Sequence, residues 1–162
     1  MSVRDTQRRK VYAAEEFVRT LFDRAARHSS RSLDFFGTAI TLPPEARFGS
    51  VGAVQRYVDE VLALPAVRRR WPDPAPLAVR PRRAATAAHY ESAGVIAVPA
   101  GAQWALRELV VLHEVAHHLD GAVSGPAHGP GFVATFCELA TLVMGPEAGH
   151  VLRVVYAKEG VR

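Results

Sequence analysis

The feature that most constrains this chain is an apolar segment that carries two histidines four residues apart. The segment runs from Leu106 to Leu119, and its apolar residues recur at helical spacing. Positions four apart lie about 40° apart around a helix axis, so His113 and His117 share one face. Two histidines and a glutamate on a buried helix need polar partners, because burying an unpaired polar group is costly. We therefore expect a buried helix with a bound metal ion.

Residues 113–117 spell His-Glu-x-x-His, the HExxH pattern. This pattern arises by chance in about one such chain in fifty. Glu114 lies about 100° around the axis from His113, beside the histidine pair. From there its carboxylate can polarise a metal-bound water without being a ligand itself. The spacing predicts metal ligands at His113 and His117 and a catalytic base at Glu114.

A catalytic zinc site needs a third protein ligand and leaves its fourth position to water. His128 is the first candidate, since it follows His117 by eleven residues in a loop rich in glycine and proline. Glu138, on the next expected helix, is the alternative third ligand. Cys137 is the single cysteine, which excludes a CxxC zinc ribbon and an intramolecular disulfide. We expect one Zn²⁺ ion bound mainly by histidine.

A hydrolase also needs a donor for the developing oxyanion. The candidates are His118, beside the motif, and three residues of the last expected helix. Of these three, we expect His150 and Tyr156 as transition-state stabilisers, and Arg153 lies on the same face of that helix. A solvated polar stripe is the alternative interpretation of that face.

The length of 162 residues suits one domain, residues 1–162, and the element order predicts an α+β fold. Charged residues near the start leave no apolar secretion signal, and no segment is long enough to span a bilayer. We expect a cytoplasmic protein with no membrane partner. Helices are expected over 5–28, from Ser50 as N-cap to Pro65, and over 103–119, 132–144 and 146–158. Strands are expected over 33–42, 77–80, 84–91 and 95–98, with a hairpin turn at 92–94 and loops over 68–81 and 121–131.

The net charge of +4 comes almost entirely from arginine. Two arginine clusters, residues 68–70 and 80–83, fit either a phosphate-binding patch or a solvated loop. Only Trp71 lies near them, so stacking on single-stranded bases has little support. A nucleic-acid partner is therefore weakly supported.

The HExxH helix followed by His128-Gly-x-x-Phe132 resembles the SprT-like branch of the zincin metallopeptidases. The wider chain, from its first helix to residues 145–160, resembles a family of actinobacterial HExxH metallohydrolases. The resemblance implies a zincin-like fold: a small antiparallel or mixed sheet, an N-terminal helix and a helical C-terminal half. It also implies zinc ligands at His113, His117 and His128, with Glu114 as general base. Residues 95–98 would then be the edge strand that binds an extended peptide, and an ordinary hairpin arm is the alternative for this segment.

The function expected from these patterns is zinc-dependent hydrolysis of peptide bonds in a peptide or protein substrate. Two alternatives stay open: a metal-dependent nuclease that uses the same histidines, and a non-catalytic binding module stabilised by zinc. The zinc ribbon found in some SprT-like proteins is absent from this chain, which weakens the case for action on DNA-bound proteins.

Overall fold

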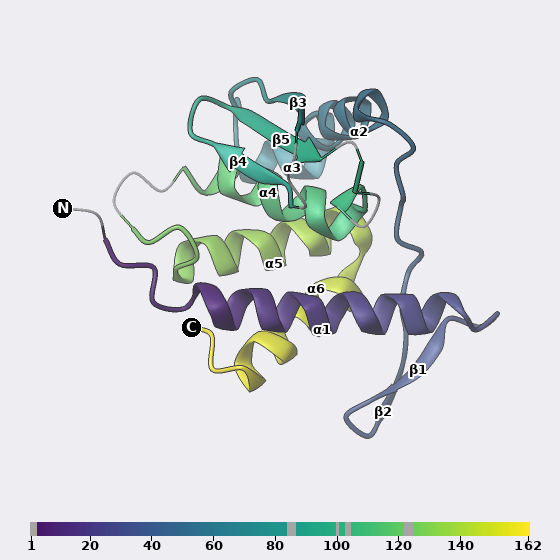
Figure 1. Cartoon of the computed structure of the whole chain (residues 1–162). Helices are drawn as coiled ribbons and strands as arrows, with labels where there is room; N and C mark the ends of the chain where they lie inside the picture. Colours follow the sequence, from purple (N-terminus) through teal and green to yellow (C-terminus); the bar gives the residue numbers. More distant parts are fainter. Residues whose placement is uncertain (1–2, 84–86, 100, 103–104, 122–124) are drawn as a thin grey trace. The chain divides into compact units, whose positions relative to one another are not determined.

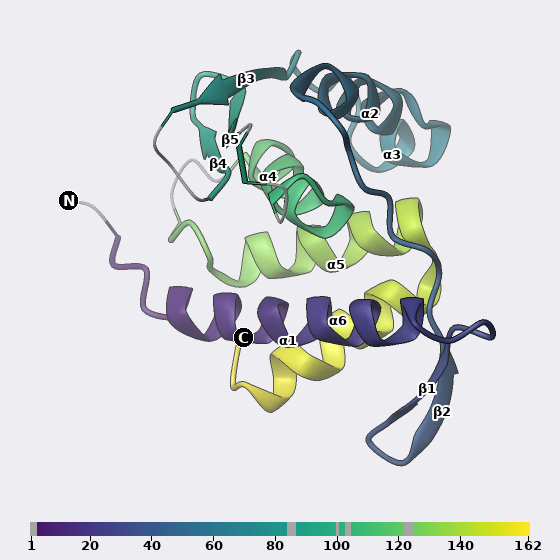
Figure 2. The ribbon, with the colours of Figure 1, turned by 45° about the vertical axis from the view of Figure 1, so that its right-hand side comes forward.

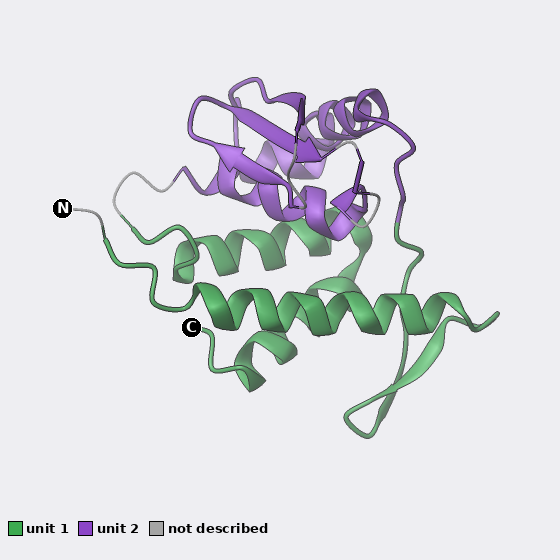
Figure 3. Cartoon of the chain, viewed as in Figure 1, with its two compact units in different colours: residues 1–45, 122–162 green, residues 46–121 purple. Residues whose placement is uncertain are grey.

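The computed structural model describes residues 3–83, 87–99, 101–102, 105–121 and 125–162. These residues form α-helices and two small β-sheets (Figure 1), which confirms the α+β class. The chain divides into two compact units, residues 1–45 with 122–162 and residues 46–121 (Figure 3). None of the described helices combines the length and the apolar character needed to cross a membrane.

The first unit is built on three helices, α1 (Arg8–Ala26), α5 (Pro130–Met144) and α6 (Pro146–Lys158). Helix α6 packs against both α1 and α5, and the three are seen from two directions in Figures 1 and 2. Apolar residues at helical spacing form the buried face of α1, as the sequence predicts. The last helix has its predicted bounds, with a proline in its first turn.

The first unit also contains a two-stranded antiparallel hairpin, β1 (Ser32–Phe35) and β2 (Thr38–Thr41). The prediction of one strand over residues 33–42 is therefore wrong. The chain reverses at Phe36 and Gly37, which both have positive φ angles of 50° and 87°. Tight hairpin turns are usually marked by two residues that favour a positive φ. Only Gly37 is of that kind here, because phenylalanine rarely adopts such a conformation.

The second unit begins with α2 (Val51–Ala63). The Ser50 hydroxyl accepts a hydrogen bond of 3.1 Å from the Ala53 backbone N–H, which confirms the predicted N-cap. A short helix, α3 (Pro65–Arg70), follows directly. It includes the start of residues 68–81, for which the sequence suggested a loop. A proline that ends one helix can open the next, because its missing N–H is not needed in a first turn.

The three-stranded sheet of this unit has the order β3-β5-β4. Strand β3 (Ala78–Arg82) is parallel to β5 (Val95–Pro99), and β4 (His89–Glu91) is antiparallel to it. The turn between β4 and β5 is closed by a bond of 3.0 Å from Gly94 N to Glu91 O, as predicted. Strand β4 is shorter than the predicted 84–91, of which residues 84–86 lie outside the described part.

The strand over residues 95–98 was expected at the edge of the sheet, and that expectation is wrong. Strand β5 is the central strand, because β3 pairs along one side of it and β4 along the other. The edge strand that packs against the motif helix is β4. A strand over residues 77–80 was predicted and overlaps β3, but its parallel pairing with β5 was not predicted.

Candidate metal centre

The HExxH motif lies on α4 (Glu108–Asp120), which packs against α2 and β4. The predicted helix began at residue 103, but residues 103–104 lie outside the described part. Glu108 fixes the start of α4: its N–H donates to Ala46 O at 3.0 Å, and its carboxylate accepts from Ala46 N at 3.1 Å and from the Tyr57 hydroxyl. Gly121 ends the helix in the left-handed conformation, with φ of 53°. The motif is thus held on a helix that is fixed at both ends.

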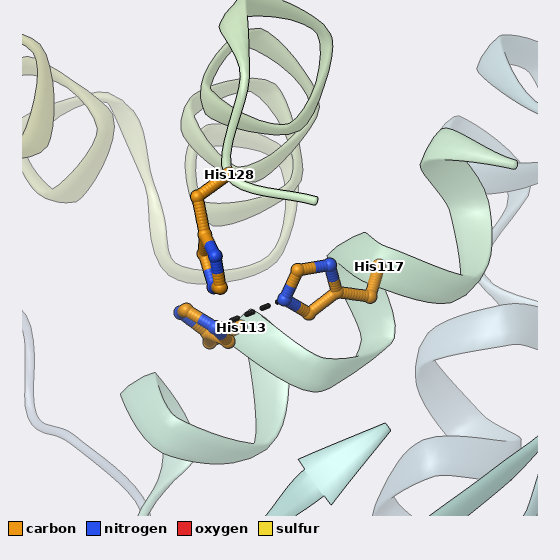
Figure 4. Close-up of side chains that lie close together, drawn as sticks. All are labelled: His113, His117 and His128. Carbon is orange, nitrogen blue, oxygen red and sulfur yellow. Dashed lines mark hydrogen bonds between the residues drawn. The ribbon is translucent and has the colours of Figure 1, made fainter. Parts of the chain in front are cut away.

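The two motif histidines face each other nitrogen to nitrogen. Their Nε2 atoms lie 3.2 Å apart, and the rings are tilted by 71° (Figure 4). Two nitrogens that bind one tetrahedral zinc ion lie about 3.3 Å apart, given Zn–N bonds of about 2.05 Å. His113 is buried and His117 is half-buried. The pair therefore has the spacing of two ligands of one ion.

Glu114 is buried next to this pair, with only 6% of its surface exposed. Among the described residues, the side chains whose ligand atoms are close enough to hold one ion are His113, His117 and His128. Glu114 does not belong to this group. Its role as general base stays a prediction. Glu138, the alternative third ligand, is likewise outside that group.

His128 is a buried histidine of the first unit, just before α5. Its Nδ1 lies 2.7 Å from Oδ2 of Asp5, and its ring meets those of Tyr12 and Phe132 edge-on. One ligand nitrogen of each of the three histidines lies within 4.8 Å of the others. This set can bind a metal ion, because neutral imidazole is a common ligand of divalent metals.

A tyrosine that the sequence analysis missed supports His117. The ring of Tyr90 on β4 lies parallel to that of His117, at 6.3 Å and 10°. The Tyr90 hydroxyl contacts Nδ1 of His118 at 3.2 Å, and Nε2 of His118 lies 2.7 Å from Ala75 O. Because a carbonyl only accepts, Nε2 of His118 carries the proton and Nδ1 accepts from the tyrosine. His118, one of the candidate oxyanion donors, contacts Tyr90 and Ala75 O.

Asp5 is the other residue that the sequence analysis missed. It was expected to begin the first helix, but α1 begins only at Arg8, and Asp5 lies in the irregular segment before it. No local pattern marks a contact between residues 123 positions apart in the chain. The Asp5–His128 contact became visible only in the folded structure.

The remaining candidates of the last helix lie in the first unit. Tyr156 is almost fully buried, and burial together with the nearby Glu15 raises the pKa of its hydroxyl well above the ordinary value. The ring of His150 lies edge-on to Phe35, at 6.1 Å. Burial raises the pKa of the Cys137 thiol to about 12, so this free cysteine keeps its proton near neutral pH and is a poor nucleophile.

The arginine clusters are partly engaged within the protein. Arg80 pairs with Glu91, and Nη1 of Arg82 donates to Ala87 O at 2.7 Å. The guanidinium of Arg70 lies over the Trp71 ring, 4.9 Å from its centre. These arginine side chains contact groups of the protein itself, and the contacts do not add support for a phosphate-binding patch.

Comparison with known proteins finds no relative: no family model, no curated protein and no solved structure matches this chain. The resemblance to SprT-like zincins therefore depends only on the motif residues given above. The function of this chain is inferred from the chemistry and the geometry of those residues.

Proposed function

We propose that this protein is a zinc-dependent hydrolase of the zincin type that cleaves peptide bonds. The observation that carries the proposal is the pair of motif histidines, whose Nε2 atoms lie 3.2 Å apart on a helix that also carries the buried Glu114. A metal centre explains why two imidazoles face each other nitrogen to nitrogen on a largely buried helix.

The proposed ligands are His113, His117 and His128. Three neutral imidazoles form a ligand set that suits zinc and leaves its fourth position to water. Asp5 supports this assignment, because a metal-binding histidine usually donates its other ring N–H to a carboxylate or carbonyl. The contact of 2.7 Å between Asp5 Oδ2 and His128 Nδ1 matches that pattern.

When bound, zinc supplies Lewis-acid chemistry, which acidifies a water and polarises a carbonyl. Glu114 then accepts the proton of the attacking water and donates it to the leaving amine. Glu114 is buried, so its carboxylate is largely shielded from bulk water.

The edge strand β4 supports a peptide as the substrate. It packs against α4 and forms one edge of the three-stranded sheet. An extended peptide can pair with such an edge through backbone hydrogen bonds. Tyr90 of this strand lies against His117, so a peptide bound along β4 would run beside the proposed ligands.

The first experiment measures metal content and activity together. We expect one zinc ion per chain after reconstitution, and cleavage of a dye-labelled unfolded protein such as casein. Glu114→Gln should keep the zinc and lose about 10²–10⁴-fold in rate, the usual contribution of a general base. His117→Ala should lose both zinc and activity.

Glu138→Gln is the matched control, because it makes the same chemical change at the rival third ligand. It should keep zinc and activity. A reconstituted wild type without zinc would refute the metal site, and an active Glu114→Gln would refute the general base. Tight zinc binding without peptide cleavage would favour the non-catalytic module, and zinc-dependent RNA cleavage would favour the nuclease.

A further inference from the structure

The imidazole of His128 is held in one tautomer by a residue from the start of the chain. Nδ1 of His128 lies 2.7 Å from Oδ2 of Asp5, and the two side chains are 6% and 21% exposed. An ionised carboxylate only accepts hydrogen bonds, so Nδ1 carries the proton in this contact. The lone pair of the neutral ring is then on Nε2, the nitrogen left available for a metal.

The backbone of His128 is fixed by a second residue of the same segment. Nε2 of Gln7 donates to His128 O at 2.7 Å and to Arg162 O at 2.8 Å. Oε1 of Gln7 accepts from Arg162 N at 3.1 Å, so its amide joins the loop before α5 to the last residue. The ring of Tyr12, from the first turns of α1, lies edge-on to the imidazole at 5.0 Å. Three side chains from residues 5–12 therefore hold both the ring and the backbone of His128.

The second oxygen of Asp5 gives an independent argument. Oδ1 of Asp5 is buried and has no hydrogen-bond partner among the described residues. A buried carboxylate oxygen without a partner is unfavourable, and a positive charge nearby offsets part of that cost. Arg8 interacts with the Asp5 charge and supplies part of it, and an ion on the far side of the His128 ring would add to it.

We propose that Asp5 is a positioning residue that orients His128 as the third metal ligand. The proposal rests on the metal site of the proposed function, to which it adds control by the segment that precedes α1. Outer carboxylates of this kind typically change metal affinity by about 10–100-fold. Loss of Asp5 should therefore weaken zinc binding while the ligands themselves are intact.

The experiment measures zinc affinity by competition with a chromophoric chelator. Asp5→Asn keeps the shape of the side chain and removes its charge, and it should weaken zinc binding about 10–100-fold. Asp34→Asn is the matched control, because the Asp34 carboxylate accepts only a weak bond of 3.4 Å from Gly37 N in the exposed hairpin. It should bind zinc like the wild type. The visible spectrum of the cobalt-loaded protein should also change in Asp5→Asn, as the His128 ligand becomes less well oriented.

A double variant tests whether Asp5 acts through His128. Once His128→Ala has removed the ligand, adding Asp5→Asn should weaken zinc binding no further. An equal loss in both backgrounds would overturn the proposal, since Asp5 would then act only as a distant charge. A wild type that binds one zinc, with Asp5→Asn equal to it, would also overturn the proposal but leave the metal site standing. A wild type that binds neither zinc nor cobalt would instead refute the metal site itself.

A measurement on the unmodified protein covers the case in which Asp5→Asn does not fold. Long-range nitrogen–proton spectra report which ring nitrogen of a histidine carries the proton. For His128 of the metal-free wild type at about pH 8, where imidazole is largely neutral, we expect the proton on Nδ1. A proton on Nε2 would overturn the proposal.

Discussion

The Nε2 atoms of His113 and His117 lie 3.2 Å apart, although both side chains project from the same helix. Without an ion, only one of the two nitrogens can donate in this contact, and the other must accept. With an ion, both present a lone pair and neither needs the N–H on that side. We therefore expect a bound metal ion to stabilise this pair of histidines.

Zinc should stabilise the folded protein. A ligand that binds only the folded state adds about 2.7 kcal/mol to the free energy of unfolding at a free concentration of 100 times its Kd. We expect the thermal unfolding temperature to rise on addition of zinc and to fall back on addition of a chelator. Differential scanning fluorimetry measures this shift.

His117→Ala should abolish that zinc-induced shift. His89→Ala is the matched control, because His89 lies on β4 beside Glu91 and does not belong to the three-histidine group. It should keep the full shift. Equal shifts in the wild type and His117→Ala would mean that zinc binds elsewhere.

Gln55 should contribute measurably to the stability of the second unit. Its amide pairs with β3 as a neighbouring strand would: Oε1 accepts from Val79 N at 2.7 Å, and Nε2 donates to Leu77 O at 3.0 Å. Gln55→Ala leaves these backbone groups without their partner, so it should cost about 1–3 kcal/mol. Glu60→Ala, on the exposed face of the same helix, should change the free energy of unfolding by less than about 0.5 kcal/mol. Urea denaturation measures both, and equal losses would show that the side-chain pairing is unimportant.

The sequence predicted some residues of the candidate site and missed others. His113 and His117 are four residues apart on one helix, so local geometry alone brings them together. His128 was foreseen as a candidate by its loop and its spacing. Asp5 and Tyr90 were not, because their contacts with His128 and His117 depend on how distant segments pack. Local periodicity contains no information on such pairs.

The same distinction holds for the fold. The amphipathic helices and the Ser50 N-cap follow from local patterns and were predicted. The hairpin turn at Phe36 and the central place of β5 were not. The first depends on a backbone conformation that phenylalanine seldom adopts, and the second on a long-range strand pairing.

Gly149 should be required for the packing of α5 against α6. A Cβ atom there would lie 1.8 Å from Oγ1 of Thr141 and 3.1 Å from Cys137 O, so alanine cannot fit without movement. Gly149→Ala should therefore destabilise the protein by about 1–3 kcal/mol, despite the higher helix propensity of alanine. At Gly52, on α2, a Cβ would meet nothing closer than 3.7 Å. Gly52→Ala should be neutral or stabilising by up to about 1 kcal/mol, and a similar loss at both sites would contradict the packing argument.

Cys137 should make stability depend on pH in the alkaline range. Burial raises the pKa of its thiol from 9.0 to about 12, so the folded state keeps the proton longer than the unfolded state does. Its contribution to the free energy of unfolding is complete below about pH 9 and decreases as the pH rises toward 12. Cys137→Ala removes this titration, whereas the effect of the lost sulfur on packing does not vary with pH.

The stability advantage of the wild type over Cys137→Ala should therefore shrink between about pH 9 and pH 11. Urea denaturation at several pH values measures it. Part of the difference reflects Tyr156, because the Cys137 thiolate also raises the pKa of that hydroxyl. The same burial predicts slow alkylation of the folded protein by iodoacetamide at about pH 8.5 and fast alkylation in urea, because the thiolate is the reactive form. A difference in stability that stays constant with pH, or rapid alkylation of the folded protein, would show that the thiol ionises freely.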